Sequence, residues 1–236
     1  MNNTALITGG AKRIGNAIAK KLALHGYDIA LHFNTSEEKA MSLQKHLQNT
    51  GVRCELFKCD LSNEKEVLNL IPEVMKKFNN IDLLINNASI FNRATLIETD
   101  INLFNKTFNI NFKAPYILTG EYAKLIKTGH IINIIDTKAE KNDFIYSCYT
   151  LSKKSLKELT LMSAKELGPD IRVNGIAPGL ILEPEGKPPE YLDEMAKNIP
   201  LKRKGNVESI TNALIFLIEN TFITGQILFV DGGQHL

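Results

Sequence analysis

Seven short apolar segments alternate along the chain with longer stretches in which apolar residues recur every three or four positions. A short continuous apolar run is typical of a strand buried on both faces, whereas the wider spacing is typical of an amphipathic helix. Strands are expected at residues 5–7, 28–33, 54–59, 81–85, 130–135, 171–176 and 227–230. Helices are expected at residues 14–23, 35–49, 63–78, 101–127 (interrupted near Pro115), 147–168 and 206–219. This order predicts an α/β, Rossmann-type fold: a doubly wound parallel sheet of about seven strands with helices on both faces.

Local signals refine two of these segments. Thr35 and Glu38 have the spacing of a capping box, which predicts the start of the second helix. Residues 180–204 contain four prolines, at positions 184, 188, 189 and 200, so they cannot form one regular helix. Ligands of open α/β sheets bind beyond the carboxyl ends of the strands, and we expect this segment to form a substrate lid there. The chain is otherwise expected to be a single dinucleotide-binding domain over residues 1–236.

Composition narrows the class of protein. A net charge of +2 over 236 residues is too small to indicate a nucleic-acid or membrane partner. Cys54, Cys59 and Cys148 fit neither a disulfide framework nor a metal site, and buried free thiols are expected. The chain shows no signal-peptide pattern and no apolar run close to the roughly 20 residues that span a bilayer. We therefore expect a cytoplasmic protein that holds no metal.

The first candidate chemistry is a tyrosine and a lysine four residues apart, Tyr149 and Lys153, in a predicted helix. That spacing places both side chains on one helical face. A phenol titrates near pH 10, and a nearby ammonium is expected to lower that pKa. The pair is a plausible proton-transfer device, although a half-exposed surface pair has the same spacing.

A glycine-rich turn joins the first strand to the first helix. Gly9 and Gly15 can bring the backbone close to a pyrophosphate at the positive end of a helix, although such a turn can also be purely structural. Lys12 and Arg13 place two cations in this turn. The second strand is followed by Asn34, Thr35 and Ser36, where an NAD-selective site would carry an acidic residue. This pattern favours the 2′-phosphate of NADPH, with Thr35 and Ser36 alternatively serving only as a helix cap.

Taken in order, these segments resemble the short-chain dehydrogenase/reductase family over essentially the whole chain. The matching segments are Thr8–Gly15 (including Ile14), Asp60-Leu61, Asn86-Asn87-Ala88-Ser89, Asn111, Tyr149 with Lys153, residues 171–179 and Asp231-Gly232-Gly233. The resemblance implies cofactor contacts from Gly9, Lys12, Arg13, Ile14, Gly15, Asn34, Thr35, Ser36, Asp60, Leu61, Asn87, Ala88, Ser89, Tyr149, Lys153, Pro178, Gly179 and Leu180. It implies a catalytic set of Asn111, Asp136, Tyr149 and Lys153, in which Asn111 holds a proton-relaying water and Lys153 bonds the nicotinamide ribose.

Three departures resemble the pteridine reductases and the dihydromonapterin or dihydrofolate reductases of that family. Asp136 stands where most members carry a serine, Arg13 replaces the middle glycine, and Ser89 replaces another glycine. The resemblance implies substrate contacts from Arg13, Ser89, Phe91, Asp136 and Tyr149, with the Phe91 ring stacked on the pterin. Alternatively, Phe91 is an ordinary loop residue and Asp136 caps the turn after its strand.

The predicted function is therefore an NADPH-dependent reductase of a pterin or dihydropterin, in which Tyr149 and Asp136 supply a proton to the reduced C=N bond. A carbonyl reductase such as a 3-oxoacyl-carrier-protein reductase shares most of the motifs and is the main alternative. A dinucleotide-binding sensor without catalysis is a more remote one. The resemblance also implies a homotetramer, formed largely by the helices around residues 101–127 and 147–168.

Overall fold

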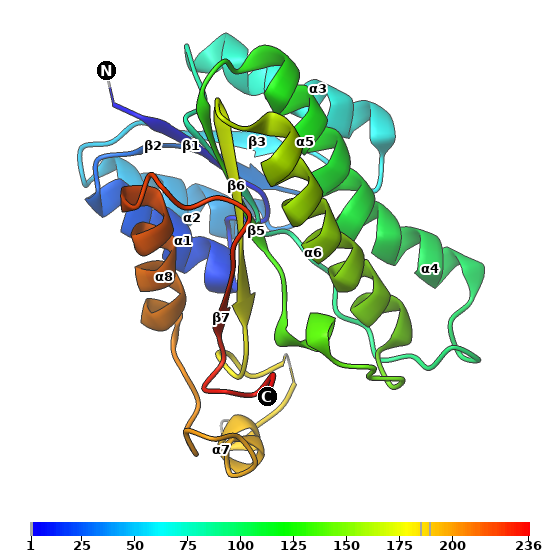
Figure 1. Ribbon diagram of the computed structural model, residues 1–236. Helices are drawn as coiled ribbons and strands as arrows, with labels where there is room; N and C mark the ends of the chain where they lie inside the picture. Colours follow the sequence, from blue (N-terminus) through cyan, green and yellow to red (C-terminus); the bar gives the residue numbers. More distant parts are fainter. Residues whose placement is uncertain (1, 185, 189) are drawn as a thin grey trace.

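The structure is a computed structural model that describes residues 2–184, 186–188 and 190–236. Seven parallel strands form one sheet in the order β3-β2-β1-β4-β5-β6-β7 (Figure 1). The strands are β1 (Thr4–Ile7), β2 (Asp28–Phe33), β3 (Cys54–Lys58), β4 (Leu83–Asn86), β5 (Gly129–Ile134), β6 (Ile171–Pro178) and β7 (Ile227–Val230). The α/β prediction is confirmed, and each strand was expected within a few residues of its position.

Helices cover both faces of this sheet (Figure 1). The α-helices are α1 (Arg13–Leu24), α2 (Glu37–Gln48), α3 (Glu64–Lys77), α4 (Ile101–Phe108), α5 (Ala114–Leu125), α6 (Ser147–Leu167), α7 (Tyr191–Ala196) and α8 (Val207–Glu219). A π-helical turn, η1 (Asn109–Lys113), joins α4 to α5, and a 3₁₀ turn, η2 (Thr137–Glu140), follows β5. One apolar core packs α1, α2 and α8 against the sheet, and a second packs α3, α5 and α6 against the opposite face. The inner strands β1, β2, β4, β5 and β6 are buried on both faces because each face has its own core, whereas most residues of the edge strands β3 and β7 are only partly buried.

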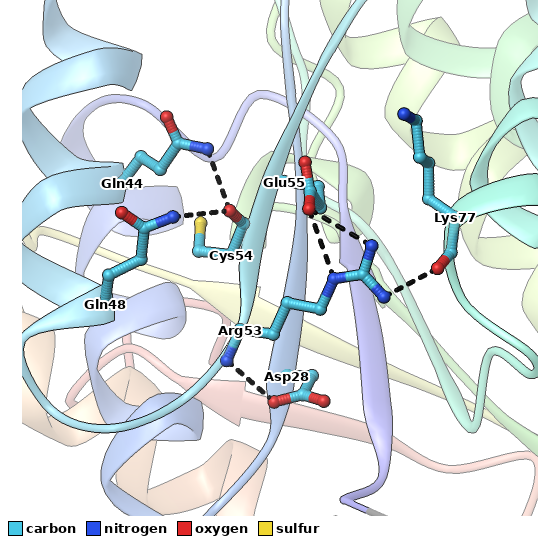
Figure 2. Close-up of polar contacts among 7 residues, drawn as sticks. All are labelled: Asp28, Gln44, Gln48, Arg53, Cys54, Glu55 and Lys77. Atoms are coloured by element: carbon cyan, nitrogen blue, oxygen red, sulfur yellow. Dashed lines mark hydrogen bonds and ion pairs between the residues drawn. The ribbon is translucent and has the colours of Figure 1, made fainter.

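The edge strand β3 is protected by polar side chains (Figure 2). Gln44 and Gln48 of α2 both donate to the carbonyl oxygen of Cys54, at 2.8 and 3.3 Å. The Arg53 guanidinium donates to Glu55 and to the backbone oxygen of Lys77. Exposed edges can pair with other strands, and these contacts occupy groups that would otherwise be available for such pairing.

One of two local predictions requires correction. The capping box at Thr35 and Glu38 does not form, because Ser36 is the N-cap of α2 and its side chain makes no capping bond. The irregularity expected near Pro115 is present as η1, which ends two residues before Pro115. Pro115 lies in the first turn of α5, and the backbone remains helical from η1 into α5.

The lid segment has a small apolar core of its own, in which Leu180 packs with Leu192, Ala196 and Ile199. Its helix α7 lies beyond the carboxyl ends of the strands, close to the C-terminus (Figure 1). Lys204 anchors the segment through ion pairs with Glu183 at 2.9 Å and Asp193 at 3.2 Å. Residues 185 and 189, which the predicted lid includes, lie outside the described residues.

The strand order reverses beside β1, since β2 and β4 flank it and lead to opposite edges of the sheet. Such a reversal opens a crevice at the carboxyl ends of the strands. The glycine-rich turn follows β1, Asn87 follows β4, and Asp136 follows β5. The fold thus gathers the predicted functional residues at one edge.

Candidate active site

Helix α6 supplies Tyr149 and Lys153, and both side chains face the protein interior. Tyr149 is 5% exposed and Lys153 is 2% exposed. The Lys153 ammonium donates to the backbone oxygen of Ile134, at the end of β5, over 2.9 Å. It lies over the Tyr149 ring, 5.8 Å from the ring centroid. The half-exposed surface pair is therefore ruled out.

Asp136 joins this pair from the end of β5. The Tyr149 hydroxyl donates to Asp136 Oδ2 over 2.7 Å, and Lys138 N–H donates to Asp136 Oδ1 over 2.7 Å. The second contact makes Asp136 the N-cap of η2. Asp136 therefore both caps this turn and contacts Tyr149, and the two interpretations of the residue do not exclude each other. One carboxylate oxygen fixes the turn, and the other is aimed at the phenol.

The acid–base properties of Tyr149 differ from the prediction. Burial raises the pKa of Tyr149 well above its usual value, and the negative charge and hydrogen bond of Asp136 raise it further. A hydrogen bond with Ser89 acts in the opposite direction. The expected lowering of the Tyr149 pKa by Lys153 was wrong, because the ammonium lies over the ring and bonds Ile134 instead of the phenol oxygen. Tyr149 is therefore a proton donor at neutral pH.

The two partners of Tyr149 are also perturbed. Burial raises the pKa of Asp136, although bonds from Lys138 and Tyr149 and the charge of Lys153 oppose that rise. Burial lowers the pKa of Lys153 to about 8, and the charge of Asp136 opposes that fall. Ionisable groups whose pKa values are shifted away from their usual values by burial and by a charged neighbour are typical of sites that transfer protons.

Asn111 lies fully buried in the π-helical turn and holds the loop after β4. Its Oδ1 accepts from Ile90 N–H at 2.9 Å, and its Nδ2 donates to the Ile90 carbonyl at 3.0 Å and to Ser152 Oγ at 3.2 Å. These bonds join the loop to α6. Asn111 thereby positions Ser89 and Phe91, the neighbours of Ile90, beside Tyr149; its predicted water stays a prediction.

An aromatic wall borders Tyr149. Phe91 is stacked on Tyr146, with ring centroids 4.4 Å apart, and meets Tyr149 edge-on at 4.6 Å. The Lys138 ammonium lies 4.5 Å from the Tyr146 ring centroid and pairs with Asp143. Phe91 is still 41% exposed, which leaves ring surface for a ligand. Tyr146 and Lys138 were missed by sequence reasoning, because no motif distinguishes them from ordinary loop residues.

The glycine-rich turn is held by its neighbours. A Cβ at Gly15 would lie 2.4 Å from the Gly9 carbonyl oxygen, so only glycine fits there. Asn87 Nδ2 donates to the carbonyl oxygens of Thr8 and Gly9, at 2.9 and 3.2 Å. His32 accepts from Gly9 N–H through Nδ1 and donates from Nε2 to the Cys59 carbonyl, each at 2.9 Å. Burial lowers the pKa of His32 to about 4, which keeps the ring neutral and able to make both bonds.

A basic cleft of about 430 Å³ opens beside this turn, between α1 and α2. Its cationic lining comprises Lys12, Arg13, Lys20 and Lys39, together with His46, and no acidic residue lines it. Arg13 adopts φ = 53°, and its guanidinium donates to the lid carbonyls of Leu182 and Glu183, at 3.2 and 3.0 Å. Lys39 was missed, because in the sequence it is one of many surface lysines.

The remaining predicted cofactor residues lie around the same crevice. Asn34, Thr35 and Ser36 follow β2 at the surface. Asp60 Oδ1 accepts from Ser62 N–H and Oγ, which lowers the pKa of Asp60, and Leu61 is buried beside it. Pro178 ends β6, where Gly179 N–H donates to Val230 and Leu180 begins the lid.

Other kinds of site find no support in residues 2–184, 186–188 and 190–236. No group of three or more His, Cys, Asp or Glu residues there could hold a metal ion. The thiols are free and buried, and burial raises the pKa of Cys54 and of Cys59 to about 12. None of the helices in this part of the chain is long and apolar enough to cross a membrane.

Comparisons with known proteins agree with this geometry. A sequence profile described as enoyl-(acyl carrier protein) reductase matches residues 9–235. The chain is 30% identical over 244 residues to the 3-oxoacyl-(acyl-carrier-protein) reductase FabG of Staphylococcus epidermidis, covering all of both chains. A crystal structure of FolM alternative dihydrofolate reductase 1 from Brucella suis in complex with NADP is 35% identical, with a TM-score of 0.94 over 99% of this chain and 95% of that one. A blue fluorescent protein from a metagenomic library, in complex with NADPH, is 30% identical, with a TM-score of 0.91 over 98% and 97% of the two chains.

Proposed function

The chain belongs to the short-chain dehydrogenase/reductase family, and from this premise we propose that it is an NADPH-dependent reductase of a pterin or dihydropterin. The observation that carries the proposal is the 2.7 Å hydrogen bond from the Tyr149 hydroxyl to Asp136. A partly buried carboxyl group with a raised pKa in this place can deliver a proton to the phenol, and reduction of a ring C=N bond requires such a proton. The alternative dihydrofolate reductases among the similar structures support the same assignment.

NADPH is the cofactor, as the bound cofactors of the similar structures support. The chain fits this group: the turn folds back so tightly that a Cβ at Gly15 would meet the Gly9 carbonyl oxygen, and the N-cap of α1, Lys12, makes no side-chain capping bond. The first-turn N–H groups of α1 are therefore available to a pyrophosphate at the positive end of the helix. The basic cleft beside the turn suits a 2′-phosphate. Lys153 would hold the nicotinamide ribose.

Bound NADPH supplies the hydride that reduces the substrate carbon. Tyr149 then donates its hydroxyl proton to the adjacent substrate nitrogen, and its raised pKa keeps that proton in place until it is needed. In the ground state the Tyr149 hydroxyl donates to Asp136 across 2.7 Å; when Asp136 is protonated, the donor and acceptor of this contact exchange, and Asp136 returns a proton to the phenol oxygen. One hydride and one proton are thereby added across the C=N bond. The Lys153 ammonium stabilises negative charge on the phenol during the transfer.

The substrate ring is assigned to the exposed face of Phe91, next to the Tyr149 hydroxyl. Tyr146 supports the opposite face of Phe91, so the ring presents a fixed apolar surface. Ser89 offers a hydroxyl to the edge of the substrate, and Arg13 can reach the same crevice when it leaves the lid carbonyls. A flat, electron-poor heterocycle suits this combination of an aromatic wall and polar edges.

A carbonyl reductase acting on 3-oxoacyl thioesters is the second candidate. The full-length similarity to a 3-oxoacyl-(acyl-carrier-protein) reductase favours it. The carboxylate at Asp136 argues against it, because a carbonyl oxygen at this position would face a negative charge whenever Asp136 is ionised.

The test is a steady-state panel that measures NADPH oxidation with dihydrobiopterin, dihydromonapterin, dihydrofolate and acetoacetyl thioesters. Turnover of at least one pterin, with a kcat/KM well above that for the thioesters, supports the proposal. Turnover of the thioesters without any pterin reduction sinks it and assigns the chain to the carbonyl reductases.

The role of Tyr149 is tested by Tyr149→Phe, which keeps the ring against Phe91 and removes only the proton donor. We expect kcat to fall by roughly 10²–10⁴-fold, the range for loss of a general acid. The Kd for NADPH, measured by fluorescence titration, should change by no more than about threefold. A kcat within about threefold of the unsubstituted enzyme would remove Tyr149 from the mechanism.

A further inference from the structure

Lys138 lies in η2, two residues after Asp136, and its backbone and side chain make different contacts. Its N–H donates to Asp136 Oδ1 over 2.7 Å and so fixes the carboxylate that faces Tyr149. Its ammonium pairs with Asp143 and lies 4.5 Å from the centroid of the Tyr146 ring. One residue therefore contacts both the carboxylate and the aromatic wall.

The ion pair of Lys138 and Asp143 is partly shielded from water and anchored to the backbone. The two side chains are 25% and 22% exposed. Asp143 accepts from Ile145 N–H over 3.0 Å through the carboxylate oxygen that Lys138 does not use. Ile145 directly precedes Tyr146, so the pair also fixes the backbone that leads to this ring. An ammonium this close to an aromatic ring is attracted to it, and more strongly where water is partly excluded.

Tyr146 passes this restraint on to Phe91. The two rings are stacked, with an angle of 11° between their planes. Phe91 is 41% exposed, so its orientation depends on its contacts with the rings of Tyr146 and Tyr149. A movement of Tyr146 would therefore displace the ring face that we assign to the substrate.

The charge of Lys138 also acts on Asp136. Burial raises the pKa of Asp136, and both the backbone N–H and the ammonium of Lys138 oppose that rise. The Tyr149 hydroxyl and the Lys153 ammonium, which face Asp136 from α6, act in the same direction as Lys138. Asp143 partly cancels the charge of Lys138 through their ion pair. Lys138 thus favours the ionised form of Asp136, and Asp143 moderates this effect.

We infer that Lys138 is a positioning residue that joins the proton-transfer pair to the aromatic wall, because its ammonium holds Tyr146, and through it Phe91, in place beside Tyr149. It acts through Tyr146 on substrate binding and through Asp136 on proton supply. The inference rests on the proposed pterin reductase activity and adds to that site a residue outside the motifs of the family.

The first test is Lys138→Met, which keeps the backbone N–H and the length of the side chain but removes the charge. At saturating NADPH, we expect KM for the pterin that the enzyme reduces best to rise roughly three- to tenfold, as for loss of one partly desolvated cation–π contact. The Kd for NADPH should stay unchanged. Lys138→Arg retains a cation that can stack on Tyr146 and pair with Asp143, so it should retain the KM of the unsubstituted enzyme.

A double-mutant cycle with Tyr146→Leu tests whether Lys138 acts through this ring. Tyr146 is only partly buried, so the substitution spares the core. KM should be raised in Tyr146→Leu alone, and adding Lys138→Met should change it by less than about twofold. Fully additive effects on KM would show that Lys138 does not act through Tyr146 and would overturn the inference.

The pH profile of kcat gives a readout that a merely structural role would not move. Lys138→Met removes a positive charge and leaves Asp143 without its partner, so Asp136 should stay protonated to higher pH and the midpoint of the profile should move upward. Asp143→Asn leaves the Lys138 ammonium uncompensated, so the same midpoint should move downward while the slope is kept. Lys154→Met is the matched control, because Lys154 lies on α6 and bonds Asn142. It should move neither KM nor the midpoint.

The outcomes separate this inference from the proposed function. Pterin reduction with an unchanged KM in Lys138→Met overturns the inference and leaves the proposed function standing. Midpoints that move in the same direction in Lys138→Met and Asp143→Asn also overturn the inference, because the two substitutions change the charge near Asp136 in opposite directions. An unsubstituted enzyme that reduces no pterin overturns both.

Discussion

Asp136 is the residue on which the proposed chemistry depends, because one carboxylate oxygen caps η2 and the other accepts a hydrogen bond from the Tyr149 hydroxyl. Its neighbour Lys153 contributes a positive charge but no bond to the phenol oxygen. The pKa of the phenol is therefore set mainly by burial and by a carboxylate, both of which oppose its ionisation. The site is set up to give a proton rather than to take one, which matches a reductase.

This arrangement predicts a pH dependence. Proton return requires protonated Asp136, and burial raises the pKa of that group, so its acid form persists at higher pH than that of an ordinary aspartate. We expect kcat to rise as the pH falls towards this pKa. Asp136→Asn keeps the shape of the side chain but removes its titrating proton. In this variant log kcat should be nearly independent of pH around the pKa of Asp136, and the maximal kcat should be about tenfold or more lower than in the unsubstituted enzyme.

Asp143→Asn serves as the control for this experiment. Asp143 lies in the same loop and pairs with Lys138, but it has no contact with Tyr149. The Asp143 variant should keep the slope of log kcat against pH. An Asp136→Asn profile with an unchanged slope would show that another group supplies the proton.

At the scale of elements, the helix after each strand was predictable because its apolar spacing and glycine stops are local features of the sequence. The π-helical turn was not, because Asn111 is buried there by contacts with Ile90 and Ser152, from distant parts of the chain. Pro115 indicated an irregularity nearby, which η1 confirms, but it did not indicate the π-helical form of that turn. The same limit applies to the Phe91–Tyr146 stack, which joins two loops far apart in the sequence.

The paired helices α1 and α2 carry a prediction about cofactor choice. Their cleft is lined by cations from both helices and by no acidic residue, so it should favour the dianionic 2′-phosphate that distinguishes NADPH from NADH. Lys39→Glu should raise the Kd for NADPH about tenfold and change the Kd for NADH far less. Lys45→Glu makes the same charge change on α2 outside the cleft and should alter both values little. Equal losses for the two cofactors in Lys39→Glu would exclude this residue from phosphate recognition.

At the scale of the whole molecule, the parallel sheet and the gathering of the site at the carboxyl ends of its strands follow from the alternation of strands and helices. The assembly does not follow in the same way. Apolar side chains are exposed on α4 to α6, among them Ile101 at 66%, Tyr116 at 60% and Met162 at 69%. A homotetramer through these helices stays a prediction, because an apolar face indicates a contact without giving the number of copies.

The stability of the molecule should depend on pH through two buried histidines, His32 and His130, whose exposed fractions are 2% and 6%. Burial lowers the pKa of His32 to about 4 and that of His130 to about 3. A histidine in the unfolded chain titrates near 6.5, so between pH 6.5 and the folded-state pKa the unfolded chain binds more protons than the folded one. The free energy of unfolding is therefore at its full value above pH 6.5 and decreases as the pH falls below it. Urea denaturation should show a loss of about 2 kcal/mol per histidine between pH 7 and pH 5.

His130→Gln should remove its share of this slope, whereas His46→Gln, at the exposed cleft, should not. A slope unchanged in His130→Gln would show that His130 is not the titrating group.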